Sequence, residues 1–185
     1  MENLVQIHYD QTGASATTDA LGMREMQRIV FQARTRQYLL VKAPPASGKS
    51  RALMFVALDK LVNQGIKRVI VAVPEKTIAR SFKDTELKRY GFFADWKVSD
   101  GFNLCAPWVK ESGLRKTFID FLSSEAKVLV CTHSTFRNAL KDLDMTLLND
   151  TFIGIDEFHH TSADERNNLG TAIRGIMAGS NAHIM

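Results

Sequence analysis

The stretch YLLVKAPPASGKS, residues 38–50, decides the fold class of this chain. It opens with a short apolar run typical of a buried strand, passes through a loop with two prolines and a glycine, and leads into a helix-forming segment. A loop between a strand and a helix presents backbone N–H groups and the positive end of the helix to a phosphate chain. The stretch therefore predicts a phosphate-binding loop in an α/β domain.

Two side chains of this loop are expected to carry chemistry. Lys49 would contact the outer phosphates of a nucleotide, and the Ser50 hydroxyl would ligate Mg²⁺. Ala43 stands where such loops usually have their first glycine. The two prolines lack N–H donors, but they precede the part of the loop that is expected to donate. The residues assigned to the nucleotide are Ala46, Ser47, Gly48, Lys49 and Ser50.

Strand and helix signals continue to alternate beyond the loop. Each helix that connects two parallel strands must pack on the sheet, so the expected fold is α/β, a predominantly parallel sheet with helices on both faces. Residues 91–112 contain only weak strand signals, near 96–98 and 103–106. Periodicity predicts helices over 21–33, 49–63, 75–88, 114–122, 134–143 and 166–177, and apolar runs predict further strands over 68–73, 127–131, 151–156 and 181–185.

The start of the chain looks different from the rest. Residues 10–18 are small and polar, which is typical of a loop or linker. Residues 1–20 are therefore expected to be an N-terminal leader, and 21–185 the folded domain. No basic segment leads into an apolar core, so the N-terminus does not resemble a secretory signal.

Composition narrows the class of protein. The chain has 185 residues, of which 45 % are hydrophobic, enough for one domain with a buried core. No apolar run approaches the roughly 18 to 20 residues that a membrane-spanning helix needs, so a cytoplasmic location without a membrane partner is expected. The net charge of +4 permits a polyanionic partner without requiring one. Cys105 and Cys131 are expected to be buried thiols.

A second motif, FIGIDEFHH at residues 152–160, delivers two consecutive carboxylates at the end of an apolar strand. Ligands of open parallel sheets bind at this end of the strands. Asp156 is suited to hold Mg²⁺, directly or through water, and Glu157 to orient and deprotonate a water molecule. His159 is interpreted as a polar link across the nucleotide cleft. Glu157 and Lys49 are thus the candidate catalytic residues.

Together these motifs resemble those of superfamily-two helicases and translocases. Asp156-Glu157-Phe158-His159 matches their Asp-Glu-x-His form of the Walker B motif, and residues 43–50 match their Ala-x-x-x-x-Gly-Lys-Ser/Thr loop. Residues 73–79 and 130–136 look like the two strand-end motifs that contact the nucleic-acid backbone, and both stand in the expected order. Residues 23–27 resemble the element that places a glutamine, here Gln27, against adenine. The similarity covers about residues 21–185 and is greatest to motor domains of restriction-enzyme-like translocases and to Asp-Glu-x-His helicases.

The resemblance implies a function in more detail. The chain would be the first RecA-like lobe of an ATP-dependent motor, using ATP and Mg²⁺. DNA is favoured over RNA, because the motifs are less similar to those of Asp-Glu-Ala-Asp RNA helicases. A second RecA-like lobe, which supplies arginines to the site in this family, is absent from these 185 residues, so the chain alone is expected to be nearly inactive. The implied contacts to the nucleic-acid backbone are Pro74, Lys76, Thr77, Arg80, Thr132 and His133.

Two other functions remain open at this level. The chain could be a phosphate-loop NTPase of another class, such as a kinase or a single-lobe ATPase switch. It could also be a nucleotide-binding or interaction module without turnover. The carboxylate pair favours hydrolysis over transfer of phosphate to a second substrate.

Overall fold

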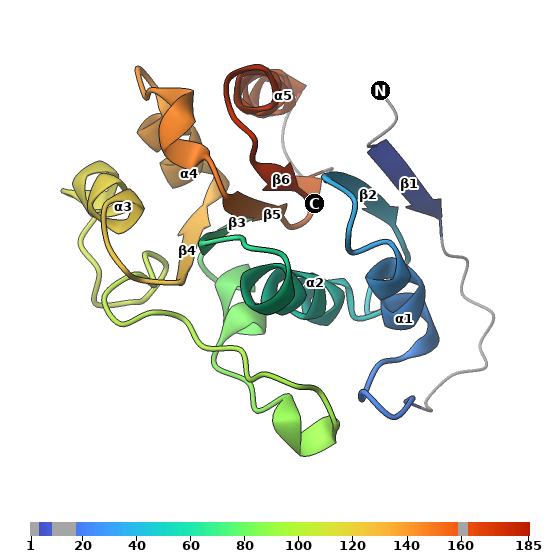
Figure 1. Ribbon diagram of the computed structural model, residues 1–185. Coiled ribbons are helices and arrows are strands. Elements are labelled where there is room, and N and C mark those ends of the chain that lie inside the picture. The colour runs from blue at the N-terminus through green and yellow to red at the C-terminus, as the bar shows by residue number, and fades with distance from the viewer. Residues whose placement is uncertain (1–3, 9–17, 159–162) are drawn as a thin grey trace.

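The centre of the protein is a six-stranded sheet whose strands all run parallel (Figure 1). The computed structural model describes residues 4–8, 18–158 and 163–185. The order of strands across the sheet is β1-β2-β6-β5-β3-β4. The α/β class with a parallel sheet, predicted from the sequence, is confirmed. The strands are β1 Leu4–His8, β2 Tyr38–Lys42, β3 Arg68–Val73, β4 Val128–Thr132, β5 Thr151–Ile155 and β6 His183–Ile184.

Helices cover both faces of the sheet. Figure 1 shows α1 and α2 on one side and α4 and α5 on the other. Successive residues of β3 divide between the two cores, as the alternation of an extended strand requires, with Val71 facing α2 and Ile70 facing α4. In the described part of the chain, no helix combines the length and apolar character needed to cross a bilayer. The helices are α1 Glu25–Gln32, α2 Lys49–Asn63, α3 Leu114–Leu122, α4 His133–Leu140 and α5 Ala163–Gly179.

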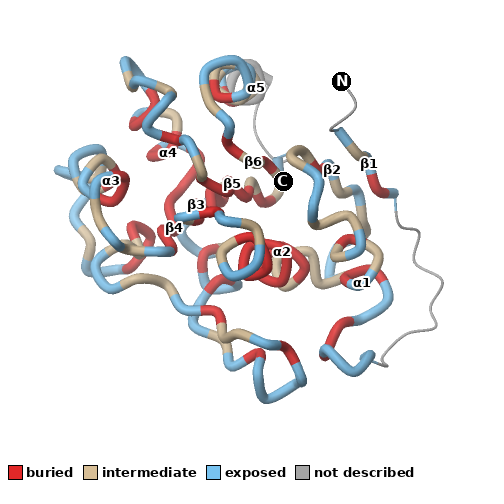
Figure 2. The backbone as a smooth tube through the Cα atoms, in the orientation of Figure 1, coloured by how far each residue is buried: buried red, intermediate tan, exposed pale blue. Residues whose placement is uncertain are grey.

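The helix that follows the phosphate loop is buried around most of its circumference. Residues 52–60 of α2 are all buried, and Figure 2 shows the helix largely in the colour of buried residues. The sheet covers one side of α2, and aromatic residues of the segment after β3 cover another. The rings of Phe55 and Phe92 lie 4.7 Å apart in an edge-on arrangement. This burial holds the first turn of α2, and with it the phosphate loop, in one position.

The predicted helix over residues 75–88 is wrong for most of its length. The structure has only two short 3₁₀ helices here, Ile78–Phe82 and Lys88–Tyr90. Thr85 and Trp96 exchange both backbone hydrogen bonds, at 2.9 and 3.0 Å, and the Trp96 indole donates to the Phe82 carbonyl at 2.8 Å. These distant partners use the backbone groups that an α-helix would need for its own hydrogen bonds.

The predicted leader is also wrong in part, because Leu4–His8 forms strand β1 of the sheet. All five residues of β1 pair in parallel with β2, from Leu4 opposite Tyr38 to His8 opposite Lys42. Ile7 is buried in the core that contains α1 and α2. The apolar residues Leu4, Val5 and Ile7 are the sequence signal for this strand. The polar tract that follows them indicates a linker, and it led to the prediction of a leader.

A buried lysine lies at the opposite end of the sheet from the phosphate loop. Lys60 of α2 is fully buried, and its ammonium group lies 2.7 Å from His183 Nδ1 and donates to the Arg36 carbonyl at 3.0 Å. Burial lowers the pKa of Lys60 to about 8. Burial and the nearby Lys60 charge lower the pKa of His183 to about 4. Both groups therefore resist protonation in the folded protein.

This pair predicts an acid-sensitive fold. Below pH 6.5 an unfolded chain protonates His183, whereas the folded chain does so only near pH 4. The free energy of unfolding should therefore fall as the pH drops from about 6.5 to 4, measured by urea denaturation. His183→Asn removes this titration and should flatten the profile in that window. An equally steep profile in the variant would show that His183 is not the cause.

Candidate nucleotide site

The two predicted motifs meet at the C-terminal edge of the sheet. The phosphate loop follows β2, and the carboxylate pair follows β5, with the short strand β6 between them in the sheet. The strands around the site are not in sequence order, since β6 and β5 lie between β2 and β3. In open parallel sheets, ligand-binding crevices form where the order of strands changes direction, at the carboxyl ends of the strands. The fold thus brings residues about a hundred positions apart into one site.

Contacts between side chains join the motifs. The Lys49 ammonium lies 3.3 Å from Glu157 Oε1 and donates to the Ala43 carbonyl at 3.1 Å. The Ser50 hydroxyl donates to Asp156 Oδ2 at 3.3 Å. The first turn of α2 therefore contacts both carboxylates that follow β5. These four side chains are those that the sequence assigned to phosphate, metal and water.

Close packing of α2 on β5 makes these contacts geometrically possible. Gly154 is the fourth of the five residues of β5, and a Cβ atom at this position would lie 2.5 Å from Leu53 Cδ1 of α2. The missing side chain lets the helix approach the strand. Glu157 lies just after β5 and has a left-handed backbone with φ of 52°. Its side chain therefore does not continue the alternation of side-chain directions along the strand. Two consecutive carboxylates can thus both reach α2.

The electrostatics of the site favour a bound cation. Burial raises the pKa of Asp156 above its usual value, and the Glu157 charge adds to this effect. The Ser50 hydrogen bond and the Lys49 charge act in the opposite direction. The Ser50 hydroxyl and the buried Asp156 carboxylate offer oxygen atoms, which are the ligands that Mg²⁺ prefers. A cation there would also offset the repulsion between Asp156 and Glu157. The residues present therefore fit a magnesium ion.

Gln27 contacts the phosphate loop itself. Its side chain is 2 % exposed and donates to the Gly48 carbonyl at 3.2 Å, while its carbonyl oxygen accepts from the Arg24 N–H at 2.8 Å. Gly48 has a φ of +90°, and a Cβ atom there would lie 2.4 Å from Gln27 Nε2. Only glycine suits this position, both for its backbone and for its space. The contact of Gln27 with adenine stays a prediction.

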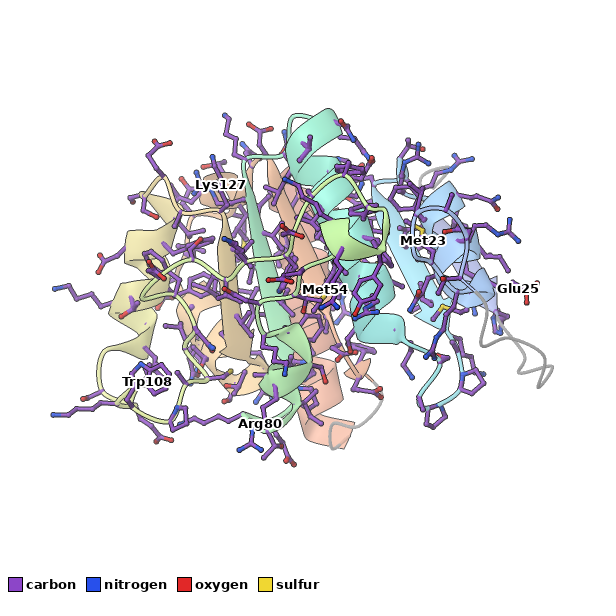
Figure 3. The ribbon with its side chains drawn as sticks, turned by 90° about the horizontal axis from the view of Figure 1, so that it is seen from below. Met23, Glu25, Met54, Arg80, Trp108 and Lys127 are labelled. Carbon is purple, nitrogen blue, oxygen red and sulfur yellow. The ribbon has the colours of Figure 1, made fainter. Side chains whose placement is uncertain are left out.

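The residues predicted to bind nucleic acid fall into two groups. Lys76, Thr77 and Arg80 are exposed in the segment after β3, with the half-buried Pro74 before them. Figure 3 places Arg80 at one edge of the molecule and Lys127 at the opposite edge. Since Arg80 follows β3 and Lys127 precedes β4, the exposed group lies at the C-terminal edge, as the motif order predicts.

The other two predicted contacts, Thr132 and His133, point inward. Thr132 Oγ1 accepts from the Thr135 N–H at 3.2 Å and caps α4, which is a common role for threonine before a helix. His133 Nε2 donates to the Asp156 carbonyl at 3.0 Å. Both side chains are at least 90 % buried, so in this conformation they position the end of β5 and present no polar group to a phosphate. We therefore leave both out of the proposed nucleic-acid surface.

A hollow of about 420 Å³ adjoins the site between the ends of β2 and β5. Residues of β1, β2 and β5 line part of it, and Lys49, Asp156 and Glu157 line it as well. The loop residues Ala46 to Gly48 are not among its lining residues. His159, predicted to bridge the cleft, lies outside the described residues.

Fold and site together define a phosphate-loop domain of the α/β class, with a pair of carboxylates at the end of β5, one strand beyond the neighbour of β2. The family model for the DEAD/DEAH box helicase matches residues 24–184. A protein of Bacillus subtilis (strain 168) described as "Putative ATP-dependent helicase YeeB" is 53 % identical over 185 residues, which cover 100 % of this chain and 31 % of that protein. The chain belongs to the DEAD/DEAH box helicase family.

The chain spans about a third of the length of this relative, since 31 % of the relative is covered. No solved structure matches the chain. The similarity to superfamily-two helicases, inferred from the motifs, is confirmed by the family match and by the relative. The family match establishes a helicase-type domain.

Proposed function

We propose that this chain is the ATP-binding first lobe of a nucleic-acid-dependent ATPase, a helicase or translocase, that contacts the nucleic-acid backbone. The observation that carries the proposal is the pairing of the first turn of α2 with the carboxylates after β5. Lys49 meets Glu157 at 3.3 Å, and Ser50 meets Asp156 at 3.3 Å. A site that only bound nucleotide would need no carboxylate beside the phosphate-binding lysine.

Each residue has a distinct task in this proposal. The backbone N–H groups of the loop hold the phosphates. Ser50 and Asp156 would hold Mg²⁺, which when bound neutralises charge on the phosphate oxygens. Phosphate would compete with Glu157 for the Lys49 ammonium, because both are anions. Glu157 then accepts a proton from the attacking water as the general base.

The lysine of the loop provides the first test. Lys49→Ala should weaken the binding of a fluorescent ATP analogue about 10- to 150-fold, because it removes a charge-assisted contact. Lys67→Ala is the matched control, since Lys67 also forms an ion pair, at 2.8 Å to Asp150, but precedes β3 at the other end of the sheet. Equal affinities of the Lys49 variant and the parent would remove the phosphate-loop assignment.

Contact with the nucleic-acid backbone is proposed for Pro74, Lys76, Thr77 and Arg80. Lys76 and Arg80 are exposed cations at the edge of the sheet that also carries the ATP site. Contacts to phosphates position a strand without reading its sequence, so the affinity should tolerate changes of sequence and fall with salt. DNA is the favoured partner, on the resemblance to restriction-enzyme-like translocases.

Arg80→Ala tests this surface. The variant should weaken single-stranded DNA binding uniformly across sequences and make the slope of log affinity against log salt shallower by about 0.7. The matched control is Lys127→Ala, an exposed cation at the opposite edge of the sheet (Figure 3). Fluorescence anisotropy at several salt concentrations measures both variants. A strong preference for one sequence, or an unchanged slope, would contradict a backbone contact by Arg80.

A further inference from the structure

A tryptophan stands out on the surface of this protein. The side chain of Trp108 is 83 % exposed, the highest value among the large hydrophobic residues that the structure describes, with Val62 next at 59 %. Single exposed apolar residues are common, so exposure alone indicates nothing. The indole of tryptophan is the largest of the apolar side chains, so it offers a large contact area. Its position on the fold decides what that area can bind.

Pairing with β4 determines where Trp108 emerges. The segment before it runs parallel to β4, because Asn103 bridges Val130, whose N–H donates to the Phe102 carbonyl at 3.1 Å. The Leu104 N–H in turn donates to the Val130 carbonyl at 2.8 Å. A segment parallel to β4 delivers the next residues to the C-terminal edge of the sheet. Figure 3 shows Trp108 and Arg80 along the same edge of the molecule.

The loop that carries Trp108 is attached to its surroundings on both sides. Before the tryptophan, Cys105 and Ala106 are buried, and the Val109 N–H donates to the Ala106 carbonyl at 3.0 Å. After it, Glu111 forms an ion pair of 3.4 Å with Lys76. This ion pair joins the loop to the segment after β3. Trp108 therefore lies on a loop that this ion pair joins to the segment of the proposed backbone contacts.

The charges around Trp108 select a polyanion as its partner. The exposed charged residues that follow Trp108 in its segment are Lys110, Arg115 and Lys116 against Glu111, which is paired with Lys76. An aromatic face among cations suits a flexible nucleic-acid strand, whose bases stack on the ring while its phosphates contact the cations. The bases of an intact duplex are stacked on one another and are not free to do so. The cations in question are Lys76, Arg80, Lys110, Arg115 and Lys116.

We propose that Trp108 is a stacking platform for an unpaired base of a single-stranded nucleic acid at the C-terminal edge of β3 and β4. The inference rests on the proposed function and deepens it, since it makes a single strand the ligand of this edge. Lys76 and Arg80 hold the phosphates on either side of the stacked base. Stacking tolerates any base, so this contact adds affinity without specificity.

The intrinsic fluorescence of the protein tests this contact directly. The chain has two tryptophans, and Trp96 is fully buried, so quenching by a base in solution reports on Trp108. The emission should fall on titration with an oligothymidylate of about 12 nucleotides and stay nearly unchanged with an abasic phosphodiester strand of equal length. Trp108→Ala should weaken oligothymidylate binding, followed by anisotropy, about 5- to 150-fold. Trp108→Phe should retain most of the affinity.

The possible outcomes separate the two proposals. Val62→Ala, at an exposed apolar residue near the end of α2, is the matched control and should bind as the parent does. If the parent binds the strand and Trp108→Ala binds equally well, stacking is wrong while the proposed function stands. The same conclusion follows if the variant weakens the abasic strand as much as oligothymidylate. If the parent binds neither strand, both the proposed function and the stacking contact fail.

Discussion

Glu157→Gln is expected to lower the rate of ATP hydrolysis about 10²- to 10⁴-fold, because an amide cannot accept the proton of the attacking water. The shape of the side chain is kept, so the fold should not change. The rate is measured as steady-state phosphate release from a version of the protein long enough to contain the proposed second lobe. A variant that hydrolyses ATP at close to the parent rate would show that Glu157 is not the base.

Nucleotide binding by the same variant should not weaken. The Glu157 carboxylate lies 3.3 Å from the Lys49 ammonium, and its loss leaves the full charge of Lys49 for a phosphate. A fluorescent ATP analogue should therefore bind Glu157→Gln as tightly as the parent or more tightly. Slow hydrolysis combined with weaker binding would indicate a damaged site instead of a missing base.

The 185-residue chain alone is expected to hydrolyse ATP about 10³- to 10⁵-fold more slowly than the full-length Bacillus subtilis relative. In the resembled motors, a second lobe supplies an arginine that stabilises charge on the transferred phosphoryl group, and contributions of this size are known for such arginines. Movement along a strand also requires two lobes that close and open. Turnover with saturating single-stranded DNA and Mg²⁺ compares the two proteins.

The result that would contradict this expectation is specific. Rapid, DNA-stimulated turnover by the 185-residue chain, lost in Glu157→Gln, would overturn its assignment as one lobe of a two-lobed site. Such a result would favour a homodimer in which a second copy completes the site. Sedimentation of the chain with and without nucleotide would then identify the dimer.

Most of the nucleotide site was predictable because each of its halves is a continuous stretch of sequence. Residues 43–50 lie between a strand and a helix, and residues 156 and 157 directly follow a strand, so local signals locate both. The parallel sheet then requires both strand ends to lie at the same edge. The ion pair of Lys49 with Glu157 was not predictable, since it depends on how closely α2 packs on β5.

A local sequence pattern alone does not show which way a side chain faces. Thr132 ends β4 and His133 begins α4, a position at which ligand-binding residues are common, yet Thr132 caps α4 and His133 contacts the end of β5. Their sequence neighbours are the same in either case. Only the burial of the two side chains separates an internal role from contact with a nucleic acid. Trp108 belongs to none of the sequence motifs, and only the structure shows its exposure and its position.

The sequence by itself determined the α/β class, the phosphate loop, the carboxylate pair and the helix that follows the loop, because each depends on neighbouring residues. The tertiary structure decided three other features. Strand β1 belongs to the sheet because its backbone pairs with β2. Residues 75–88 do not form an α-helix because Thr85 pairs with Trp96. The loop with Trp108 reached the edge of the sheet because Asn103 pairs with Val130. These hydrogen bonds join residues that lie outside one another's local sequence window, so the periodicity of a segment cannot predict them.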